Sequence, residues 1–264
     1  MTIGPVWKTA WVTGASTGIG RELAIRLAVS GVRVAATARN ADKLVELAQQ
    51  SRNIAVFRAD VTDAAEMRAA HARIVETFGA VDLAILNAGV WDQGLAKGYS
   101  AERAMTTMAV NYAGLANALE PLIEGMVARR AGHIALVSSV AGYRGLPKAV
   151  YYAPSKAAAI SLAEVLQCEL APHGIKVSIV NPGFVETPMT AVNDFPMPYL
   201  MKVEDAAQRI LRGLEKGKFE IAFPWQLVAM LKLARVLPYP VYFWLVRNVI
   251  ARAAEDDAVQ KRPV

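Results

Sequence analysis

The sequence predicts a single-domain α/β fold: a doubly wound parallel sheet of about seven strands with helices on both faces. Two observations predict it. Short apolar runs alternate with helical patterns along most of the chain, a rhythm typical of parallel strands joined by crossover helices. The segments rich in glycine, asparagine and serine all follow these apolar runs, and ligands of such folds bind at the carboxyl ends of the strands.

The composition suits one large domain, because 264 residues of which 54% are hydrophobic can bury a sizeable core. The formal net charge of +6 is spread along the chain, without a basic block or basic residues interleaved with aromatic ones. This charge favours an anionic ligand or an acidic membrane surface, and we expect no nucleic-acid partner.

The single cysteine, Cys168, excludes an intramolecular disulfide and suits a reducing cytoplasm. Its place on a predicted helix indicates a small buried hydrophobe and not a nucleophile. The histidines His71, His133 and His173 lack the spacing of metal ligands, so no metal site is expected. Residues 1–5 carry neither the charged nor the apolar region of a signal peptide, so we expect a cytoplasmic protein.

The first predicted strand, residues 8–13, runs into a glycine-rich turn and a helix that ends before Gly31. The turn comprises Gly14, Ser16, Thr17, Gly18, Ile19 and Gly20. Glycines let backbone approach a ligand, and the free N–H groups of a helix start favour phosphate oxygens. The spacing Gly-x-x-x-Gly-x-Gly differs from the commoner dinucleotide fingerprint Gly-x-Gly-x-x-Gly. The alternative interpretation is a turn that merely packs.

Residues 32–38 form the second predicted strand, and Arg39 stands at its end. In a dinucleotide-binding fold this end faces the adenosine ribose. A carboxylate would accept from the 2′-hydroxyl, whereas Arg39 offers a cation for a 2′-phosphate. NADP(H) is therefore favoured over NAD(H). NAD(H) stays the alternative because Thr17 adds no second cation, and because Arg39 in the other interpretation points to solvent.

The remaining elements continue the alternation. Further strands are predicted over residues 54–59, 82–86, 132–137 and 176–180, and helices over residues 63–78, 101–130 and 152–171. The run 82–86 is uniformly apolar, as central parallel strands are. Asn111 lies inside the predicted helix 101–130, where an asparagine alone indicates little.

Tyr152 and Lys156 lie four residues apart at the start of a predicted helix, so both side chains share one face. Pro154 is tolerated there because the first turn needs no N–H at that position. An unperturbed tyrosine has a pKa of about 10, and a neighbouring ammonium lowers it toward the working pH. On its own this pair is common on solvated helices.

Together these segments resemble the short-chain dehydrogenase/reductase family, which has a Rossmann-like fold. The resemblance covers about Val6 to Ala222 and depends on the joint order of its motifs. These are Thr13-Gly14-x-x-x-Gly18-Ile19-Gly20, Asp60, Asn87-Ala88-Gly89, Asn111, Ser139, Tyr152-x-x-x-Lys156 and Asn181-Pro182-Gly183. Ser139 and not Ser138 matches the family serine, because it begins the sequence Ser-x-x-Gly.

The resemblance implies that Tyr152 is the general acid or base, that Lys156 lowers its pKa, and that Ser139 donates to the substrate oxygen. Lys156 also holds the nicotinamide ribose, and Asn111 holds a water that links Lys156 to solvent. The implied cofactor-binding residues are Gly14, Ser16, Thr17, Gly18, Ile19, Gly20, Arg39, Asp60, Val61, Asn87, Ala88, Gly89, Tyr152, Lys156, Pro182, Gly183, Val185 and Thr187. Members of the family are commonly dimers or tetramers, so the resemblance implies a homodimer or homotetramer.

The segment after Gly183, about residues 184–203, is rich in methionine, aromatic side chains and proline. It suggests an apolar lid over a hydrophobic carbonyl or alcohol substrate, or side chains that merely fill a gap.

Residues 223–264 form an apolar and basic extension outside the resemblance. Its apolar runs are too short to span a bilayer, and their tryptophans and basic residues suit peripheral membrane contact. They also suit a roof over the substrate pocket or a subunit interface.

The sequence thus predicts an NADP(H)-dependent oxidoreductase that interconverts an alcohol and its carbonyl compound. The alternatives are a catalytically silent nucleotide-binding or regulatory protein on the same fold, and a membrane-surface component.

Overall fold

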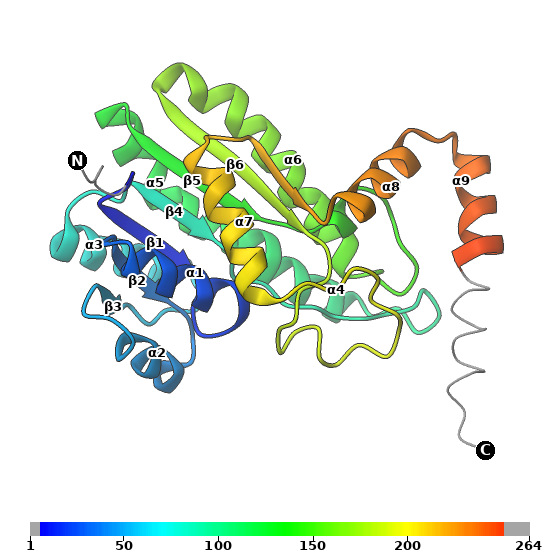
Figure 1. The fold of residues 1–264 in the computed structure, drawn as a ribbon, viewed down its shortest axis with the longest axis horizontal. Helices are drawn as coiled ribbons and strands as arrows, with labels where there is room; N and C mark the ends of the chain where they lie inside the picture. The colour runs from blue at the N-terminus through cyan, green and yellow to red at the C-terminus, as the bar shows by residue number, and fades with distance from the viewer. Residues whose placement is uncertain (1–5, 251–264) are drawn as a thin grey trace.

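Seven strands form one sheet in the computed structural model, which describes residues 6–250 (Figure 1). The strands are β1 (Thr9–Thr13), β2 (Arg33–Thr37), β3 (Ile54–Val56), β4 (Leu83–Leu86), β5 (Gly132–Val137), β6 (Ile175–Pro182) and β7 (Glu220–Phe223). They lie in the order β3-β2-β1-β4-β5-β6-β7, and every neighbouring pair is parallel. The chain order reverses between β1 and β4, which is where a ligand crevice is expected.

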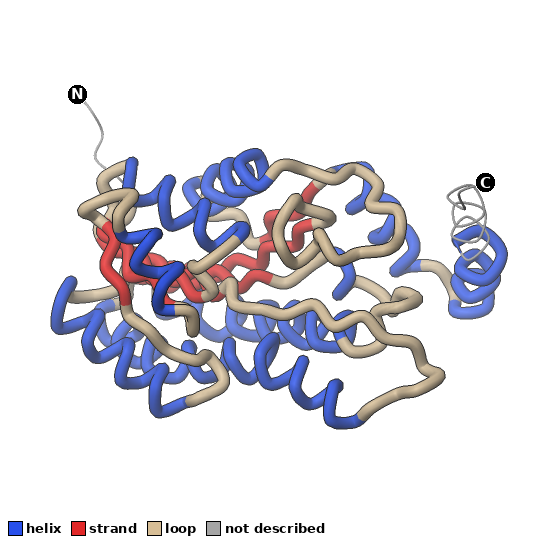
Figure 2. The backbone as a smooth tube through the Cα atoms, turned by 90° about the horizontal axis from the view of Figure 1, so that it is seen from below, coloured by secondary structure: helices blue, strands red, loops and turns tan. Residues whose placement is uncertain are grey.

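Helices cover both faces of this sheet (Figure 2). The α-helices of the described residues are α1 (Gly18–Val29), α2 (Ala41–Ala48), α3 (Ala64–Phe78), α4 (Ala101–Met108), α5 (Gly114–Arg129), α6 (Tyr152–Leu170), α7 (Val203–Glu215), α8 (Trp225–Val236) and α9 (Tyr239–Leu245), the last of which stands apart from the sheet. This arrangement confirms the predicted doubly wound α/β fold.

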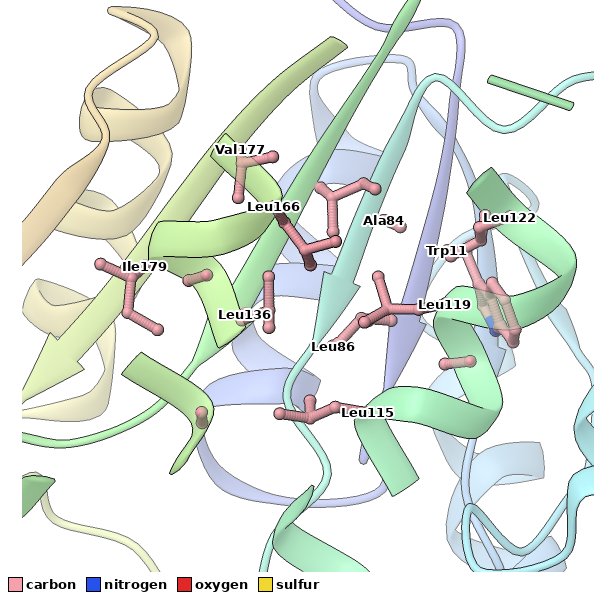
Figure 3. Close-up of a cluster of buried hydrophobic side chains, with 14 of the residues drawn as sticks. Trp11, Ala84, Leu86, Leu115, Leu119, Leu122, Leu136, Leu166, Val177 and Ile179 are labelled. Carbon is pink, nitrogen blue, oxygen red and sulfur yellow. The ribbon is translucent and has the colours of Figure 1, made fainter. Parts of the chain in front are cut away.

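The core lies in two layers because successive strand residues point to opposite faces. Trp11 and Leu86 face the layer that α3, α5, α6 and α8 cover, whereas Val12 and Ile85 face the layer under α1, α2 and α7. Figure 3 shows the first layer, in which leucines of α5 such as Leu119 meet the strand side chains. Both layers are buried, which explains why the central strands are apolar throughout.

Three details differ from the sequence prediction. The strand expected over residues 54–59 ends at Val56, although the N–H of Phe57 still donates to the carbonyl oxygen of Ala36 at 3.0 Å. The helix expected over residues 101–130 is interrupted by a π-helical turn over Ala109–Ala113. Cys168 is exposed, because the buried face of α6 carries residues such as Leu166 and Leu170 instead.

The C-terminal extension begins inside the sheet. β7 crosses the boundary drawn at Ala222, and α8 packs on the core through Leu227 and Leu231. No helix among residues 6–250 is long and apolar enough to cross a bilayer. Residues 1–5, which carried the signal-peptide argument, and residues 251–264 of the extension lie outside the described residues.

Candidate active site

The glycine-rich turn between β1 and α1 lies directly against the segment that follows β4. Gly14 has a φ of +65°, and a Cβ at this position would lie 2.7 Å from the Cα of Ala88. Only glycine allows both the left-handed backbone and this close approach. The turn and the Asn87–Gly89 segment, which are far apart in sequence, therefore form one surface.

The first turn of α1 presents free N–H groups at this surface. Thr17 precedes the helix and makes no side-chain hydrogen bond to it, so the amide groups of the first turn keep no partner from their own cap. Such a helix start attracts an anion through its N–H groups and its dipole. The residues present fit the diphosphate of an NAD(P) cofactor.

A cavity of about 310 Å³, here called the cofactor cleft, extends from the turn past the ends of β2, β3 and β4. Its walls include twelve of the predicted cofactor-binding residues: Gly14, Ser16, Thr17, Gly18, Ile19, Arg39, Asp60, Val61, Asn87, Ala88, Gly89 and Thr187. The topology therefore gathers residues from five separate segments at one edge of the sheet.

A second cavity of about 100 Å³, here called the inner cavity, adjoins the cofactor cleft. Its walls include the predicted residues Ser139, Tyr152, Lys156, Pro182, Gly183 and Val185. Both cavities share Ile19, Asn87, Gly89, Thr187 and Met189. One continuous cleft consequently runs from Arg39 at the outer end to Tyr152 at the inner end.

Arg39 lies at the outer end with 64% of its side chain exposed, and its Nη1 is 3.8 Å from Oδ2 of Asp60. Asp60 is oriented by its own loop, since its Oδ1 accepts from the N–H and the hydroxyl of Thr62, each at 2.9 Å. Arg58 donates from Nε to the carbonyl oxygen of Arg39 at 3.1 Å. Arg39 lines this end of the cleft beside the carboxylate of Asp60, and the N–H of Asp60 donates to Oε2 of Glu66 at 2.8 Å.

Asn87 fixes the floor of the cleft. Its N–H and that of Ala88 donate to Oγ1 of Thr13 at 3.0 and 3.2 Å, and its Nδ2 donates to the carbonyl oxygens of Thr13 and Gly14 at 3.1 and 3.3 Å. These bonds hold the ends of β1 and β4 together at the point where the strand order reverses.

Tyr152 and Lys156 lie on the first turn and a half of α6, in the wall of the inner cavity. Lys156 is buried, and its Nζ donates to the carbonyl oxygen of Val137 at 3.1 Å. The same Nζ lies 5.5 Å from the centre of the Tyr152 ring. Ser139 follows β5 and donates from Oγ to the carbonyl oxygen of Pro182 at 3.3 Å.

Burial dominates the proton affinities of this group. It raises the pKa of Tyr152 to about 12, and the hydrogen bond with Ser139 opposes that rise. It lowers the pKa of Lys156 from 10.5 to about 8. The sequence predicts that Lys156 lowers the pKa of Tyr152, and in this structure burial is the largest influence on that pKa. At neutral pH Tyr152 is therefore a proton donor.

Asn111 lies in the π-helical turn, a geometry that recurs at functional sites. Its side chain is buried: Oδ1 accepts from the N–H of Val90 at 2.7 Å, and Nδ2 donates to the carbonyl oxygen of Val90 and to Oγ of Ser155, both at 3.0 Å. Ser155 in turn donates to the carbonyl oxygen of Tyr152 at 2.7 Å. Asn111 thus ties the segment after β4 to the start of α6.

Two predicted site residues line neither cavity. Asn111 is one, and Gly20 is the other. Gly20 is buried on α1, where a Cβ would collide with the carbonyl oxygen of Gly14. Because Gly20 has no side chain, α1 can pack close against the glycine-rich turn, and the N–H of Gly20 lies in the first turn of the helix.

Trp91 lies two residues after Gly89 and belongs to none of the motifs predicted from the sequence. Its ring meets that of Tyr152 edge to face, with centroids 4.8 Å apart. Phe195 of the segment after β6 lies 6.3 Å from Trp91 and 6.0 Å from Phe184. The Nε1 atom of Trp91 is buried without a hydrogen-bond partner among the described residues. These rings form an apolar wall beside Tyr152.

Comparisons with known proteins agree with this geometry. The family model described as short chain dehydrogenase matches residues 8–195. An uncharacterized oxidoreductase of Myxococcus xanthus is 39% identical over 241 residues, which are 89% of this chain and 95% of the relative. The 2,3-dihydro-2,3-dihydroxybenzoate dehydrogenase of Bacillus subtilis is 36% identical over 212 residues, which are 78% of each chain.

Among solved structures, an actinorhodin polyketide ketoreductase with NADPH has a TM-score of 0.77 and 26% identity, over 84% of this chain and 97% of that one. The family model, the relatives and the parallel sheet with its cleft at the β1–β4 crossover all lead to one assignment. The chain belongs to the short-chain dehydrogenase family, oxidoreductases built on an NAD(P)-binding Rossmann fold.

Proposed function

We propose that the protein is an NADP(H)-dependent oxidoreductase that interconverts an apolar secondary alcohol and its ketone. One observation carries the proposal: Tyr152, Ser139 and Lys156 line an inner cavity that opens into the cofactor cleft. A proton donor and a hydrogen-bond donor therefore stand where a substrate carbonyl would meet the reactive end of a dinucleotide.

Each residue of this group has a role that its surroundings support. When bound, the nicotinamide cofactor supplies or accepts the hydride at the substrate carbon. Tyr152 gives its proton to the substrate oxygen in reduction and takes it back in oxidation. Ser139 stabilises the charge that develops on that oxygen. Lys156 holds the nicotinamide ribose, and its charge favours the phenolate that proton transfer leaves behind.

Asn111 supports this group as a positioning residue. Its bonds to Val90 and Ser155 hold the start of α6, which carries Tyr152 and Lys156. Asn111 also holds a water through which Lys156 exchanges protons with solvent. At the two ends of the cofactor, Asp60 contacts the adenine, and Thr187 and Pro182 contact the nicotinamide amide.

The preference for NADP(H) is supported by charge at the outer end of the cleft. The Arg39 guanidinium is exposed beside the position of the adenosine ribose, and Arg58 lies against its backbone. A 2′-phosphate would receive charge-assisted hydrogen bonds there. The solved ketoreductase has NADPH in its structure.

The apolar substrate is supported by the rings beside Tyr152. Trp91, Phe184 and Phe195 lie together on one side of the site, from two segments that the sheet topology brings into contact. A planar or hydrophobic carbonyl compound would pack against them without leaving polar groups buried. Residues 184–203 act in this proposal as the lid.

We also propose a cellular location, an oligomeric state and a membrane contact for the enzyme. We place it in the cytoplasm as a homodimer or homotetramer, with residues 1–222 as the catalytic domain. The extension, residues 223–264, makes peripheral contact with a membrane. The exposed apolar side chains of α8 and α9 support this last part.

The test is the consumption of NADPH, with NADH in parallel, across a panel of apolar ketones and aldehydes. Tyr152→Phe should bind NADPH normally and lose turnover by at least about 100-fold, because it removes only the proton donor. Tyr151→Phe is the matched control, since this neighbouring tyrosine is buried and its hydroxyl oxygen accepts from the N–H of Ser100. Full turnover by Tyr152→Phe would refute the assigned role.

The cofactor preference is tested separately with Arg39→Ser. The ratio of kcat/KM for NADPH over NADH should fall about tenfold or more, the effect of losing hydrogen bonds to a charged group. Arg52→Ser, which removes an exposed arginine outside the cleft, should leave the ratio unchanged. An unchanged ratio in Arg39→Ser would exclude Arg39 as the determinant.

A further inference from the structure

The C-terminal helices carry an apolar surface that faces away from the core. On α8 one side is buried through Leu227, Leu231 and Ala234, while the other side exposes apolar residues. α9 stands apart from the sheet at the far end of α8 (Figures 1 and 2). Six large exposed side chains define what is here called the C-terminal surface: Trp225, Leu233, Val236, Tyr239, Phe243 and Trp244.

The exposure of this surface is high for side chains of this size. Trp225 is 73% exposed, Tyr239 70% and Trp244 59%. Exposed apolar residues are normal when scattered singly, but six large ones within residues 225–244, on two consecutive helices, mark an interaction site.

The charges beside the surface favour one partner. No aspartate or glutamate occurs between Glu220 and Asn248, whereas Lys232, Arg235 and Arg247 do. All three basic side chains are exposed, and Lys232 pairs with Glu220 at the edge of the sheet. A second copy of the chain would bring like charges together with no acidic residue on the surface to offset them. An anionic lipid surface offers the complementary charge.

The side-chain types also match a lipid surface. Tryptophan and tyrosine concentrate at the boundary of the bilayer, where the ring is buried and the polar atom stays hydrated. α8 and α9 are too short to span the membrane, so they would lie in the interface plane with the basic residues at the headgroups.

The surface is joined to the active site by one arginine. Arg144 lies in the segment between Ser139 and Tyr152, and it donates to the carbonyl oxygens of Ala234 at 2.9 Å and Leu237 at 3.1 Å. Its guanidinium also lies over the rings of Tyr239 and Tyr242, at 4.8 and 4.2 Å from their centres.

The other connection runs from α8 to the cleft itself. A Cβ on Gly183, in the wall of the inner cavity, would lie 2.8 Å from Leu227 of α8. The helix that carries the C-terminal surface therefore also borders the active site. A membrane bound by the outer side of α8 would lie one helix away from the cavity.

From these observations we infer that the C-terminal surface binds the interface of an anionic membrane and holds the active site beside the bilayer. This inference rests on the proposed function in one respect: an apolar carbonyl substrate would then reach Tyr152 from the lipid phase. The surface itself is defined without reference to catalysis.

Flotation of the full-length protein with vesicles tests the inference. Vesicles of phosphatidylglycerol and phosphatidylcholine should carry the wild type, and pure phosphatidylcholine should carry much less. The double variant Phe243→Glu/Trp244→Glu should bind the anionic vesicles at least about tenfold more weakly, because it removes apolar area and adds repulsive charge. The matched control is Val29→Glu/Val45→Glu, which places two charges on exposed valines of α1 and α2.

Three outcomes would overturn the inference. The first is wild type that stays unbound to anionic vesicles, and the second is a control variant that loses as much binding as the double variant. The third is an oligomer that light scattering finds in the wild type but not in the double variant, while the wild type does not float, which would assign the surface to a second copy. NADPH oxidation with a water-soluble ketone, measured without vesicles, should be the same in both variants. Its absence in the wild type would count against the proposed function and leave the flotation result intact.

Discussion

Replacing Lys156 by methionine should stabilise the protein at neutral pH while it destroys activity. Burial lowers the pKa of Lys156 from 10.5 to about 8. This shift means that the charged side chain lowers the free energy of unfolding by about 3 kcal/mol. Methionine has a similar shape without the charge. It also leaves the carbonyl oxygen of Val137 without the 3.1 Å bond from Nζ, which costs about 1 kcal/mol. The net gain at pH 7 is about 2 kcal/mol.

The stability difference between wild type and Lys156→Met should depend on pH. Below pH 8 the lysine is charged in both folded and unfolded chains, so the wild type bears the full cost. Between about pH 8 and pH 10.5 the folded chain loses its proton first, and wild-type stability rises with pH. Wild-type stability rises by about 1.4 kcal/mol per pH unit in this range, so the advantage of Lys156→Met should shrink above pH 8 and reverse at about pH 9.5.

Urea denaturation without cofactor, followed by circular dichroism at pH 7 and pH 10, measures the effect. Lys43→Met, which removes an exposed lysine on α2, controls for the loss of one positive charge. The reasoning would be refuted if Lys156→Met were less stable than wild type at pH 7. A stability difference that did not change with pH would refute it as well.

Two further predictions test the backbone of the cleft and the core. Gly14→Ala should lose NADPH binding, and its free energy of unfolding should fall more than that of Gly31→Ala. Both glycines have a positive φ, but only at Gly14 would the added Cβ meet the backbone of Ala88. Equal losses of stability in urea titrations would argue against the clash. His133 is buried with its pKa lowered to about 4, so the folded state stays neutral while the unfolded chain takes up a proton below pH 6.5. Stability should fall by up to about 3 kcal/mol from pH 6.5 to pH 4, and His133→Leu should lack most of that fall in denaturation midpoints; an identical acid profile in the variant would exclude His133 as the cause.

The order of elements and most cleft residues could be predicted from the sequence, because both depend on local chemistry. Buried parallel strands must be apolar, and a few adjacent residues are enough to identify a glycine-rich turn before a helix. Gly14, Asn87 and Tyr152 were recognised in this way, and the folded chain places all three along one cleft.

Other features depended on how distant segments meet. Trp91 meets Tyr152, and Phe195 meets Trp91, only when the segments after β4 and β6 come together beside the start of α6. The proton affinities of Tyr152 and Lys156 follow from burial, which sequence spacing does not report. The sequence predicts a buried Cys168 because it lies on a helix with no basic or helix-start setting to activate a thiol, but the exposure of its side chain follows from the face that α6 turns to the sheet.

By itself, the sequence determined the α/β architecture, the family and the set of residues around the cleft, since periodicity and short motifs carry that information along the chain. The tertiary structure decided which of these side chains touch, what each one's proton affinity is, and which face of the C-terminal helices stays exposed. Those properties follow from distance and burial in three dimensions, and both arise only when β1 and β4, more than seventy residues apart, lie side by side.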